Sequence, residues 1–182
     1  FHYIYFLPWK SQMVEGIENA GGKVLLFSAS NNIRIMLKAG KVIDYIRKEQ
    51  IQLIHCHLPW AGFLGRFIQW RTSIPVFYSE HNIQERYHFI TKWLNKITFN
   101  RQTKTIAVSN EVAASIQKNI HPKISVQTVL NGVDTNRFIR NHEAGLSIRS
   151  QYSIPKDTVL MGTIAVFRRS EEHTSELQSH SF

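Results

Sequence analysis

The sequence contains one cysteine and no long apolar run. The first excludes a fold stabilised by internal disulfides, and the second argues against a membrane-spanning protein. Cys56, alone among 182 residues, cannot form a disulfide within the chain, which favours a reducing compartment such as the cytoplasm. No run of about 18 apolar residues occurs, so we expect no membrane-spanning segment. The first residues, FHYIYFLP, lack the basic start of a signal peptide and read as a strand or loop entered midway.

Acidic residues are few compared with basic ones. The sequence has 22 Lys and Arg against 13 Asp and Glu, a formal charge of +9. This balance favours anionic partners such as phosphates, nucleotides, acidic headgroups or nucleic acid. A nucleic-acid-binding domain is the most distant of these alternatives, because no recognised module is present and the positive charges are spread along the chain. We therefore predict no nucleic-acid partner.

The last fourteen residues, RSEEHTSELQSHSF, contain only two apolar residues, Leu177 and Phe182. They show no helix or strand period, and Arg169–His180 resembles the translation of a widely used sequencing-library adapter. A genuine polar tail is the alternative. We treat residues 169–182 as a non-native tail and leave Arg169–His180 out of the fold. Without that stretch the basic residues fall by one, to 21, and the acidic residues by three, to 10.

Two short apolar runs, Ile51–Ile54 and Ile74–Tyr78, organise the rest of the chain. The first leads into His55 and His57, and the second into His81. The segment between them has apolar residues at i, i+3, i+4, i+7 and i+8, which predicts one face of a helix: Trp60, Phe63, Leu64, Phe67 and Ile68. A strand–helix–strand unit has parallel strands, and open α/β sheets bind ligands beyond the carboxyl ends of their strands. We therefore expect the three histidines at the working edge.

Strand and helix patterns alternate along the whole sequence. Further strands are predicted at residues 23–27, 104–108, 126–130 and 159–167, and further helices at 9–20, 38–50, 84–101, 109–119 and 146–152. The alternation predicts an α/β class with a Rossmann-like, mainly parallel sheet and helices on both faces. The composition becomes polar after Phe138. This shift predicts an N-terminal domain at 1–138, then a linker and the start of a second domain at 139–168.

The helix predicted over Gln84–Arg101 combines apolar and basic residues. Its expected buried face consists of Ile90, Trp93, Leu94 and Ile97. Basic residues among aromatic ones suit an anionic membrane surface or a charged acceptor, while a solvated helix face over a buried stripe explains the same residues. The expected location is therefore the cytoplasm, and attachment to the inner face of the cell membrane is the alternative.

The order of these motifs resembles that of the family-4 retaining glycosyltransferases, which have the GT-B fold. The matching stretches are IQLIHCHLPWAGFLGR, IPVFYSEHN, TKTIAVSNEV, VQTVLNGVDTNRF and SIPKDTVLMGTIAVFR. Such enzymes pair two Rossmann-like domains, of which the N-terminal one mostly holds the acceptor and the C-terminal one the nucleotide sugar. The resemblance implies that the chain is an incomplete N-terminal half of this fold, without the first strand and glycine-rich loop.

The function implied by the resemblance is transfer of a sugar from a nucleotide-sugar donor to a hydroxyl acceptor, either a glycan or a lipid-linked molecule, with retention. The fragment itself is expected to be inactive, since most of the donor domain is missing from it. A nucleotide-sugar epimerase shares the fold and is the close alternative. No cofactor is implied beyond the nucleotide-sugar co-substrate.

The resemblance also assigns roles to individual residues. His81, in the SEHN run, matches the histidine that reaches the donor sugar and is the catalytic candidate. Arg168 stands where the family places a guanidinium on the donor diphosphate, and Asn131 with Gly132 lies beside the donor pocket. For each of these a purely structural role at a strand end or turn is the alternative. The acceptor side is assigned to His57, Glu80, Asn82 and Arg86.

Two other residue patterns have the composition of a metal or nucleotide site. His55 and His57 would point the same way on a strand, with Cys56 opposite, which raises the question of a zinc site. No carboxylate stands at metal spacing and the resembling enzymes need no metal, so we expect none and take His55 as a packed strand residue. The glycines of WAGFLGR lack the G-x-G-x-x-G spacing and are expected to let the helix pack closely on the sheet: Gly62 and Gly65.

Overall fold

The computed structural model describes residues 1–162 of the chain. Arg168, the tail at 169–182 and most of the strand expected at 159–167 lie outside the described residues, and Val159–Gly162 form neither helix nor strand. The chain divides into two compact units, Phe1–Gly132 and a second one that begins at Val133. Each unit is described by itself.

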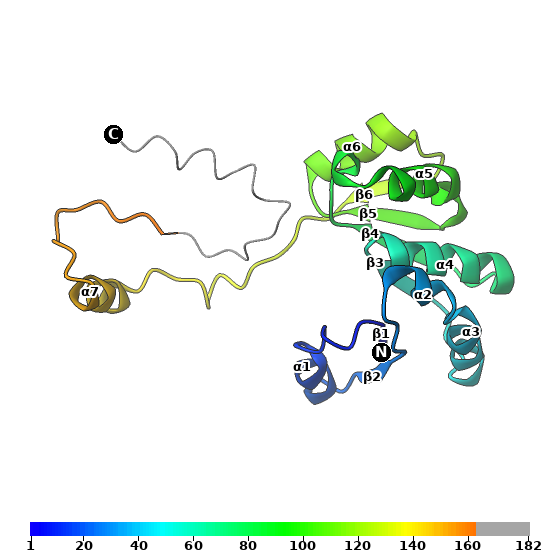
Figure 1. Ribbon diagram of the computed structural model, residues 1–182, viewed down its shortest axis with the longest axis horizontal. Helices are drawn as coiled ribbons and strands as arrows, with labels where there is room; N and C mark the ends of the chain where they lie inside the picture. The colour runs from blue at the N-terminus through cyan, green and yellow to red at the C-terminus, as the bar shows by residue number, and fades with distance from the viewer. Residues whose placement is uncertain (163–182) are drawn as a thin grey trace. The chain divides into compact units, whose positions relative to one another are not determined.

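The first unit is built on parallel strands (Figure 1). Strand β1 (His2–Tyr5) pairs with β2 (Lys23–Leu26). The second sheet has the order β3-β4-β5-β6, and all of its pairings are parallel. Its strands are β3 (Ile54–His57), β4 (Val76–Glu80), β5 (Lys104–Ala107) and β6 (Val126–Thr128). The α/β class with parallel strands is therefore confirmed, with the described strands divided between two sheets.

Helices occupy the connections between strands. In the first unit they are α1 (Val14–Asn19), α2 (Asn32–Met36), α3 (Ala39–Lys48), α4 (Pro59–Thr72), the short 3-10 helices η1 (Gln84–Arg86) and η2 (Phe99–Arg101), α5 (Phe89–Thr98) and α6 (Asn110–Ile120). The second unit contains α7 (His142–Gln151). None of the helices within residues 1–162 is long and apolar enough to cross a membrane.

Several element boundaries differ from the sequence expectation. The helix expected from Trp9 begins only at Val14. Helix α2 was not predicted from the sequence; the Asn31 side chain caps it by accepting a hydrogen bond from the Arg34 backbone N–H at 2.9 Å. The helix expected over 84–101 is divided into η1, α5 and η2, and the extended backbone of Tyr87 separates η1 from α5.

Strand β3 begins three residues later than expected and contains the histidines instead of preceding them. The Ile51 backbone N–H donates to the Ile46 carbonyl at the end of α3, so the apolar run at 51–53 connects the helix to the strand. His55 and His57 are consequently strand residues with defined neighbours, paired in register with Phe77 and Ser79 of β4.

Two apolar clusters stabilise the first unit. One lies on a single face of the second sheet and is built from Cys56, Val76, Tyr78, Phe99, Ala107, Val112, Ile116 and Ile120. The other joins α2, α3 and α4 and is built from Ala29, Ile35, Ala39, Val42, Ile46, Leu64 and Ile68. Burial of such side chains supplies most of the free energy of folding.

Helix α4 packs very closely on the second sheet, as expected from its glycines. A Cβ atom built on Gly65 would lie 2.4 Å from the Cys56 Sγ atom, and one on Gly62 would lie 2.8 Å from the Tyr78 ring. Real side chains do not approach this closely, so the helix could not occupy this position with alanine at either site. Both glycines are therefore required by packing.

The variant Gly65→Ala is expected to lower the free energy of unfolding by about 1–3 kcal/mol, because the added methyl group overpacks the contact with Cys56. Gly40→Ala on α3 is the matched control. Nothing lies within 4 Å of a Cβ at that position, so stability should stay equal or rise by up to about 1 kcal/mol. Urea unfolding measures both. Equal midpoints for the two variants would contradict the packing argument, and Cys56→Ala should partly rescue Gly65→Ala.

Helix α5 buries a different face from the one expected, so that prediction is wrong. Asn95 is fully buried, whereas Ile90, Trp93 and Ile97 are 47%, 60% and 54% exposed. Asn95 is held by hydrogen bonds to Arg66 and Gln84. These buried polar contacts set the rotation of α5 about its axis, so that Ile90, Trp93 and Ile97 face solvent.

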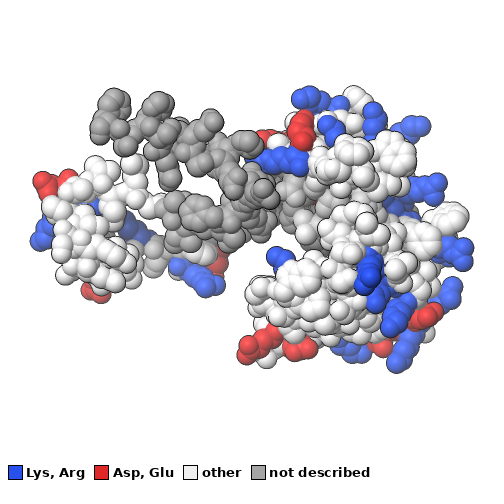
Figure 2. Space-filling view, viewed as in Figure 1, with Lys and Arg blue, Asp and Glu red and all other residues white. Residues whose placement is uncertain are grey.

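Basic side chains are scattered over the face of the molecule that Figure 2 shows, with acidic ones in smaller number. On this face of the first unit they do not form a single continuous stripe. The distribution agrees with the spread of lysine and arginine along the sequence.

Candidate functional site

Three histidines meet at the carboxyl ends of β3 and β4. The Nδ1 atom of His57 lies 3.0 Å from the Nε2 atom of His81, and the ring centroids of His55 and His57 are 4.4 Å apart. His55 Nε2 lies 2.9 Å from the Ser79 hydroxyl. Cys56 points to the opposite face and is buried, as the strand alternation predicts.

His55 does not behave as the packed residue that we expected. It is exposed, because it lies on the face of β3 opposite to Cys56 and outside both apolar clusters. Its neighbours are polar, the Ser79 hydroxyl and the ring of His57. His55 thus belongs to the histidine cluster rather than to the core.

Two members of the histidine cluster, His55 and His57, favour the neutral imidazole form. Partial burial lowers the pKa of His57 to about 4, with further lowering from His55 and His81. The pKa of His55 is also lowered, first by burial and then by His81. A neutral imidazole has one donor and one acceptor nitrogen, so the His57–His81 contact uses one of each. Such groups can orient hydroxyl groups without adding a positive charge.

A low His57 pKa predicts a specific pH dependence of stability. The folded-state pKa, about 4, is below the usual 6.5, so the folded chain binds fewer protons than the unfolded chain between these values. The contribution of neutral His57 is therefore complete above about pH 6.5 and is lost as the pH falls toward 4.

The variant His57→Gln should accordingly show a shallower loss of stability than the wild type between pH 7 and pH 5. Urea midpoints measured at the two pH values give the slope. Identical slopes for the two proteins would mean that His57 titrates normally.

The loop after β4 folds around the carboxylate of Glu80, which is fully buried. One carboxylate oxygen accepts hydrogen bonds from the backbone N–H groups of His81 at 3.0 Å and Asn82 at 3.3 Å, and from the Tyr87 hydroxyl at 2.5 Å. The other accepts from the Tyr78 hydroxyl at 2.9 Å and the Gln84 amide at 2.7 Å. Glu80 was expected on the acceptor side, but its burial excludes a direct contact there. It holds the backbone of His81 in place instead.

The side chain of Arg66 in α4 lies beneath the same loop and is 1% exposed. Its guanidinium donates to the side-chain oxygens of Gln102 at 2.7 Å and Asn95 at 2.9 Å, and also to Thr98 at 2.9 Å. It also lies over three aromatic rings, the closest being Tyr78 at 4.9 Å from the ring centroid. Burial lowers the pKa of Arg66 to about 10, so the group stays charged at neutral pH.

Asn95 connects the two buried charges. Its oxygen accepts from Arg66 and its amide donates to Glu80 at 3.5 Å and to Gln84 at 3.0 Å. Sequence reasoning missed Arg66. The available signal was the single arginine within the largely apolar helix WAGFLGRFIQW. The next residue, Phe67, was expected on the buried face but is 37% exposed.

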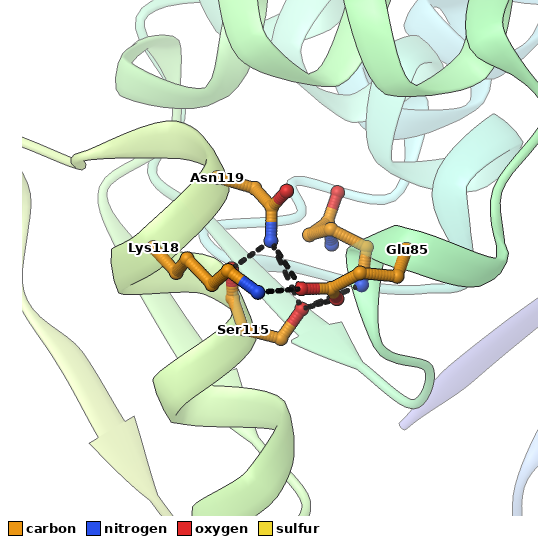
Figure 3. A network of polar contacts seen from close by, with 5 residues as sticks. Glu85, Ser115, Lys118 and Asn119 are labelled. Atoms are coloured by element: carbon orange, nitrogen blue, oxygen red, sulfur yellow. Dashed lines mark hydrogen bonds and ion pairs between the residues drawn. The ribbon is translucent and has the colours of Figure 1, made fainter.

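A second polar network attaches the loop to α6 (Figure 3). The Ser115 hydroxyl accepts from the Gln84 backbone N–H at 2.8 Å and donates to the Glu85 carboxylate at 2.5 Å. The other carboxylate oxygen of Glu85 accepts from Asn119 at 2.9 Å and lies 3.4 Å from the Lys118 ammonium. These hydrogen bonds, that of Ser115 first, lower the pKa of Glu85 to about 2. The network therefore fixes the first two residues of η1 to α6.

The remaining predicted site residues are more dispersed. Asn82 is partly buried next to His81, with its amide 3.4 Å from the Tyr87 hydroxyl, while Arg86 is exposed on η1. Asn131 and Gly132 are exposed after β6, two strands away from β4. Arg168 lies outside the described residues. Within residues 1–162, no group of three or more His, Cys, Asp or Glu side chains has a geometry that could hold a metal ion.

One family model matches the chain, and several solved structures share its fold. The sequence model of Glycosyltransferase Family 4 matches residues 9–137. Among solved structures, Anabaena HepE in complex with UDP and glucose superposes with a TM-score of 0.67 at 19% identity, covering 84% of this chain and 42% of HepE. At this identity the likeness shows the fold alone. A search of curated proteins gives no match.

Two other solved structures show the same fold. A glycosyltransferase from Rickettsia africae has a TM-score of 0.58 at 16% identity, covering 80% of this chain and 40% of its own. Sucrose-phosphate synthase from Thermosynechococcus elongatus has a TM-score of 0.58 at 14% identity, covering 82% and 47%. The chain thus spans less than half the length of each of these proteins.

Proposed function

The chain belongs to glycosyltransferase family 4, and from this premise we propose that it is the acceptor-side part of an enzyme that moves a sugar from a nucleotide-sugar donor to a hydroxyl group, with retention. The acceptor is a glycan or a lipid-linked molecule. The observation that carries the proposal is the His57–His81 pair, held at the carboxyl edge of β3 and β4 by the buried Glu80. HepE has been solved with UDP and with UDP-glucose, which supports a uridine nucleotide sugar as the donor.

In this proposal His81 contacts the donor sugar. Departure of the nucleoside diphosphate builds positive charge on the sugar and negative charge on the phosphate, and a preorganised neutral group can orient the sugar hydroxyls through that change. The Nε2 atom of His81 is hydrogen-bonded to His57, so the Nδ1 atom is the one that would contact the sugar. The hydrogen bonds from the His81 and Asn82 backbone to Glu80 provide the preorganisation.

The other roles follow the same division of the site. His57, Asn82 and Arg86 are proposed on the acceptor side, and Asn131, Gly132 and Arg168 on the donor side. A guanidinium at position 168 would suit bidentate pairing with a diphosphate. We propose that the reaction uses no metal and no cofactor beyond the nucleotide-sugar co-substrate.

Sugar transfer is favoured over epimerisation by the state of Glu80. An epimerase of this fold uses carboxylates in its chemistry, whereas the carboxylate of Glu80 is fully buried and accepts hydrogen bonds at both of its oxygens. It is therefore not available to a substrate.

The test is an assay of the whole enzyme, expressed from its complete reading frame, with a panel of nucleotide sugars and hydroxyl acceptors. The expected result is acceptor-dependent release of the nucleoside diphosphate and a product with the anomeric configuration of the donor. The 182-residue chain alone is expected to transfer no sugar, because it spans 42% of the length of HepE. Interconversion of nucleotide sugars without any acceptor would instead support an epimerase.

A further inference from the structure

Helices α3 and α4 border a groove that the histidine cluster does not use. The two helices pack on each other through the second apolar cluster (Figure 1). Two adjoining hollows between them, of about 500 and 600 Å³, share Arg47 and Arg71 in their lining and are together called the α3–α4 groove. The first hollow is also lined by Gly40, Ile43, Asp44 and Trp70, and the second by Ile46, Gln50, Ile51, Gln52, Thr72 and Ile74.

The two arginines of the groove lie toward the edge of the sheet opposite to the histidine cluster. Helix α3 ends at Lys48 before β3 begins, and α4 ends at Thr72 before β4 begins. Arg47 and Arg71 are in the last turns of these helices and are therefore near the amino ends of the strands, whereas His81 follows the carboxyl end of β4. A ligand held by the two arginines would leave the histidine cluster free.

Two guanidinium groups line the groove without an acidic partner. Among residues 1–162 the ion pairs include neither Arg47 nor Arg71, and both residues are exposed. A cation in the last turn of a helix is favourable by itself, but this does not require two of them to line the same hollows. Guanidinium groups in one groove suit a carboxylate or a phosphate, which they bind through two parallel hydrogen bonds.

The other lining residues distinguish between these anions. Asp44 is exposed and belongs to none of the ion pairs of the described residues. Its negative charge opposes a phosphate monoester, which carries about −1.5 to −2, more than it opposes a carboxylate. Carboxylate and amide side chains also hydrogen-bond hydroxyl groups, and the exposed amides of Gln50 and Gln52 lie in the second hollow. The groove therefore favours a ligand with both carboxylate and hydroxyl groups.

Trp70 adds an aromatic surface to the groove. Its side chain is 63% exposed, and the Arg71 guanidinium lies 5.8 Å from the centroid of its ring. The face of an aromatic ring carries negative potential, so it attracts the C–H groups on the flat side of a sugar ring. An exposed tryptophan beside two arginines is thus able to hold a sugar and its carboxylate together.

We propose that the α3–α4 groove binds an acidic saccharide, a sugar chain that carries carboxylate groups. Arg47 and Arg71 pair with the carboxylates, Trp70 covers one sugar ring, and Asp44 accepts hydrogen bonds from hydroxyl groups. Such a site would hold an acidic sugar chain on the protein without occupying the histidine cluster. The inference does not depend on sugar transfer. An acidic peptide is the alternative occupant, and the experiment separates the two by matching their charge.

The experiment is an NMR titration of the 182-residue chain labelled with ¹⁵N. The probes are trigalacturonate, an acetylated and amidated triglutamate peptide with the same number of carboxylates, and the neutral trisaccharide maltotriose. Trigalacturonate is expected to shift the indole N–H signal of Trp70 and the Nε–H signals of Arg47 and Arg71 in a saturable way. The peptide and maltotriose should each bind at least about tenfold more weakly, because each lacks one of the two kinds of group that the groove pairs.

Two groups of variants locate the binding. Arg47→Gln with Arg71→Gln should weaken trigalacturonate binding at least about tenfold, because the charged hydrogen bonds are lost. The control is Arg34→Gln with Arg101→Gln, which removes two exposed arginines that line neither hollow. The control should bind within about threefold of the wild type, because salt screens charges that do not touch the ligand.

The aromatic contact has its own variant and control. Trp70→Ala should weaken binding about fivefold. Trp93→Ala removes a tryptophan of similar exposure, 60% against 63%, from α5 and should bind as the wild type does. The NMR spectrum of each variant also shows whether it is folded.

Four results would overturn the proposal. One is a folded chain whose Trp70 signal does not move with trigalacturonate. Equal affinity for the triglutamate peptide would mean that the groove binds an acidic peptide or charge alone, and equal affinity for maltotriose would mean that the arginines take no part. Equal losses in the groove variants and their controls would indicate diffuse attraction by net charge. None of these readouts involves sugar transfer, so the proposal can fail while the proposed function stands.

Discussion

The variant His81→Ala of the whole enzyme is expected to lose about 10²–10³-fold in both kcat and kcat/KM. The imidazole lies at the carboxyl edge of β4, and its position is determined by the bond to His57 and by the backbone hydrogen bond to Glu80. A group preorganised in this way acts mainly in the transition state, so kcat and kcat/KM should fall together while KM changes little. Steady-state kinetics with the donor measures the effect.

The matched control for His81→Ala is His55→Ala in the same histidine cluster. His55 bonds to Ser79 rather than to His81, so its loss should cost about 0.5–1.5 kcal/mol of stability and leave turnover within about threefold. Urea unfolding of each variant separates lost folding from lost chemistry. If His81→Ala turns over within about threefold of the wild type, His81 does not contact the reacting sugar.

The variant Arg66→Ala is expected to destabilise the chain by about 3–5 kcal/mol, a large share of the 5–15 kcal/mol that typical domains have. The truncation leaves the buried oxygens of Gln102 and Asn95 without their donor. It also removes a cation from between the rings of Phe63, Tyr78 and Phe99, where it leaves a cavity. Urea unfolding of the 182-residue chain measures the change.

Arg71→Ala supplies the control for Arg66→Ala, because Arg71 is on the same helix but exposed. Its effect should stay within about 0.5 kcal/mol. Arg66→Met should lose less than Arg66→Ala, since a thioether of similar length refills the space and contacts the rings. An Arg66→Ala effect as small as that of Arg71→Ala would show that the buried network contributes little to folding.

The sequence predicted the parts of the fold that depend on local pattern. Apolar periodicity indicated α4, the alternation of strand and helix patterns placed α6 within residues 109–119, and the glycines indicated close packing of α4 on the sheet. Each of these signals acts between residues a few positions apart, so no tertiary information was needed. The histidine edge was also predictable, because parallel strands place their carboxyl ends together.

The extents of β3 and α5 could not be predicted, because competing hydrogen bonds decide them. The Ile51 N–H is taken by the end of α3, which delays β3 and draws His55 and His57 into the strand. The extended Tyr87 places its hydroxyl on Glu80, which interrupts the helix expected over 84–101. In both cases the residues have the propensity for the longer element, and a contact elsewhere shortens it.

The direction in which α5 faces was decided by tertiary structure alone. Its residues have the same period whether the apolar side lies inward or outward, so periodicity predicts a helix but not its rotation about its axis. The rotation is determined by Arg66 of α4 and Glu80 of β4, which form hydrogen bonds with the buried side of α5 at Asn95. If α5 turned its apolar side inward, Arg66 would lose two of its three hydrogen-bond acceptors, Asn95 and Thr98. A buried charge that loses such partners is strongly unfavourable.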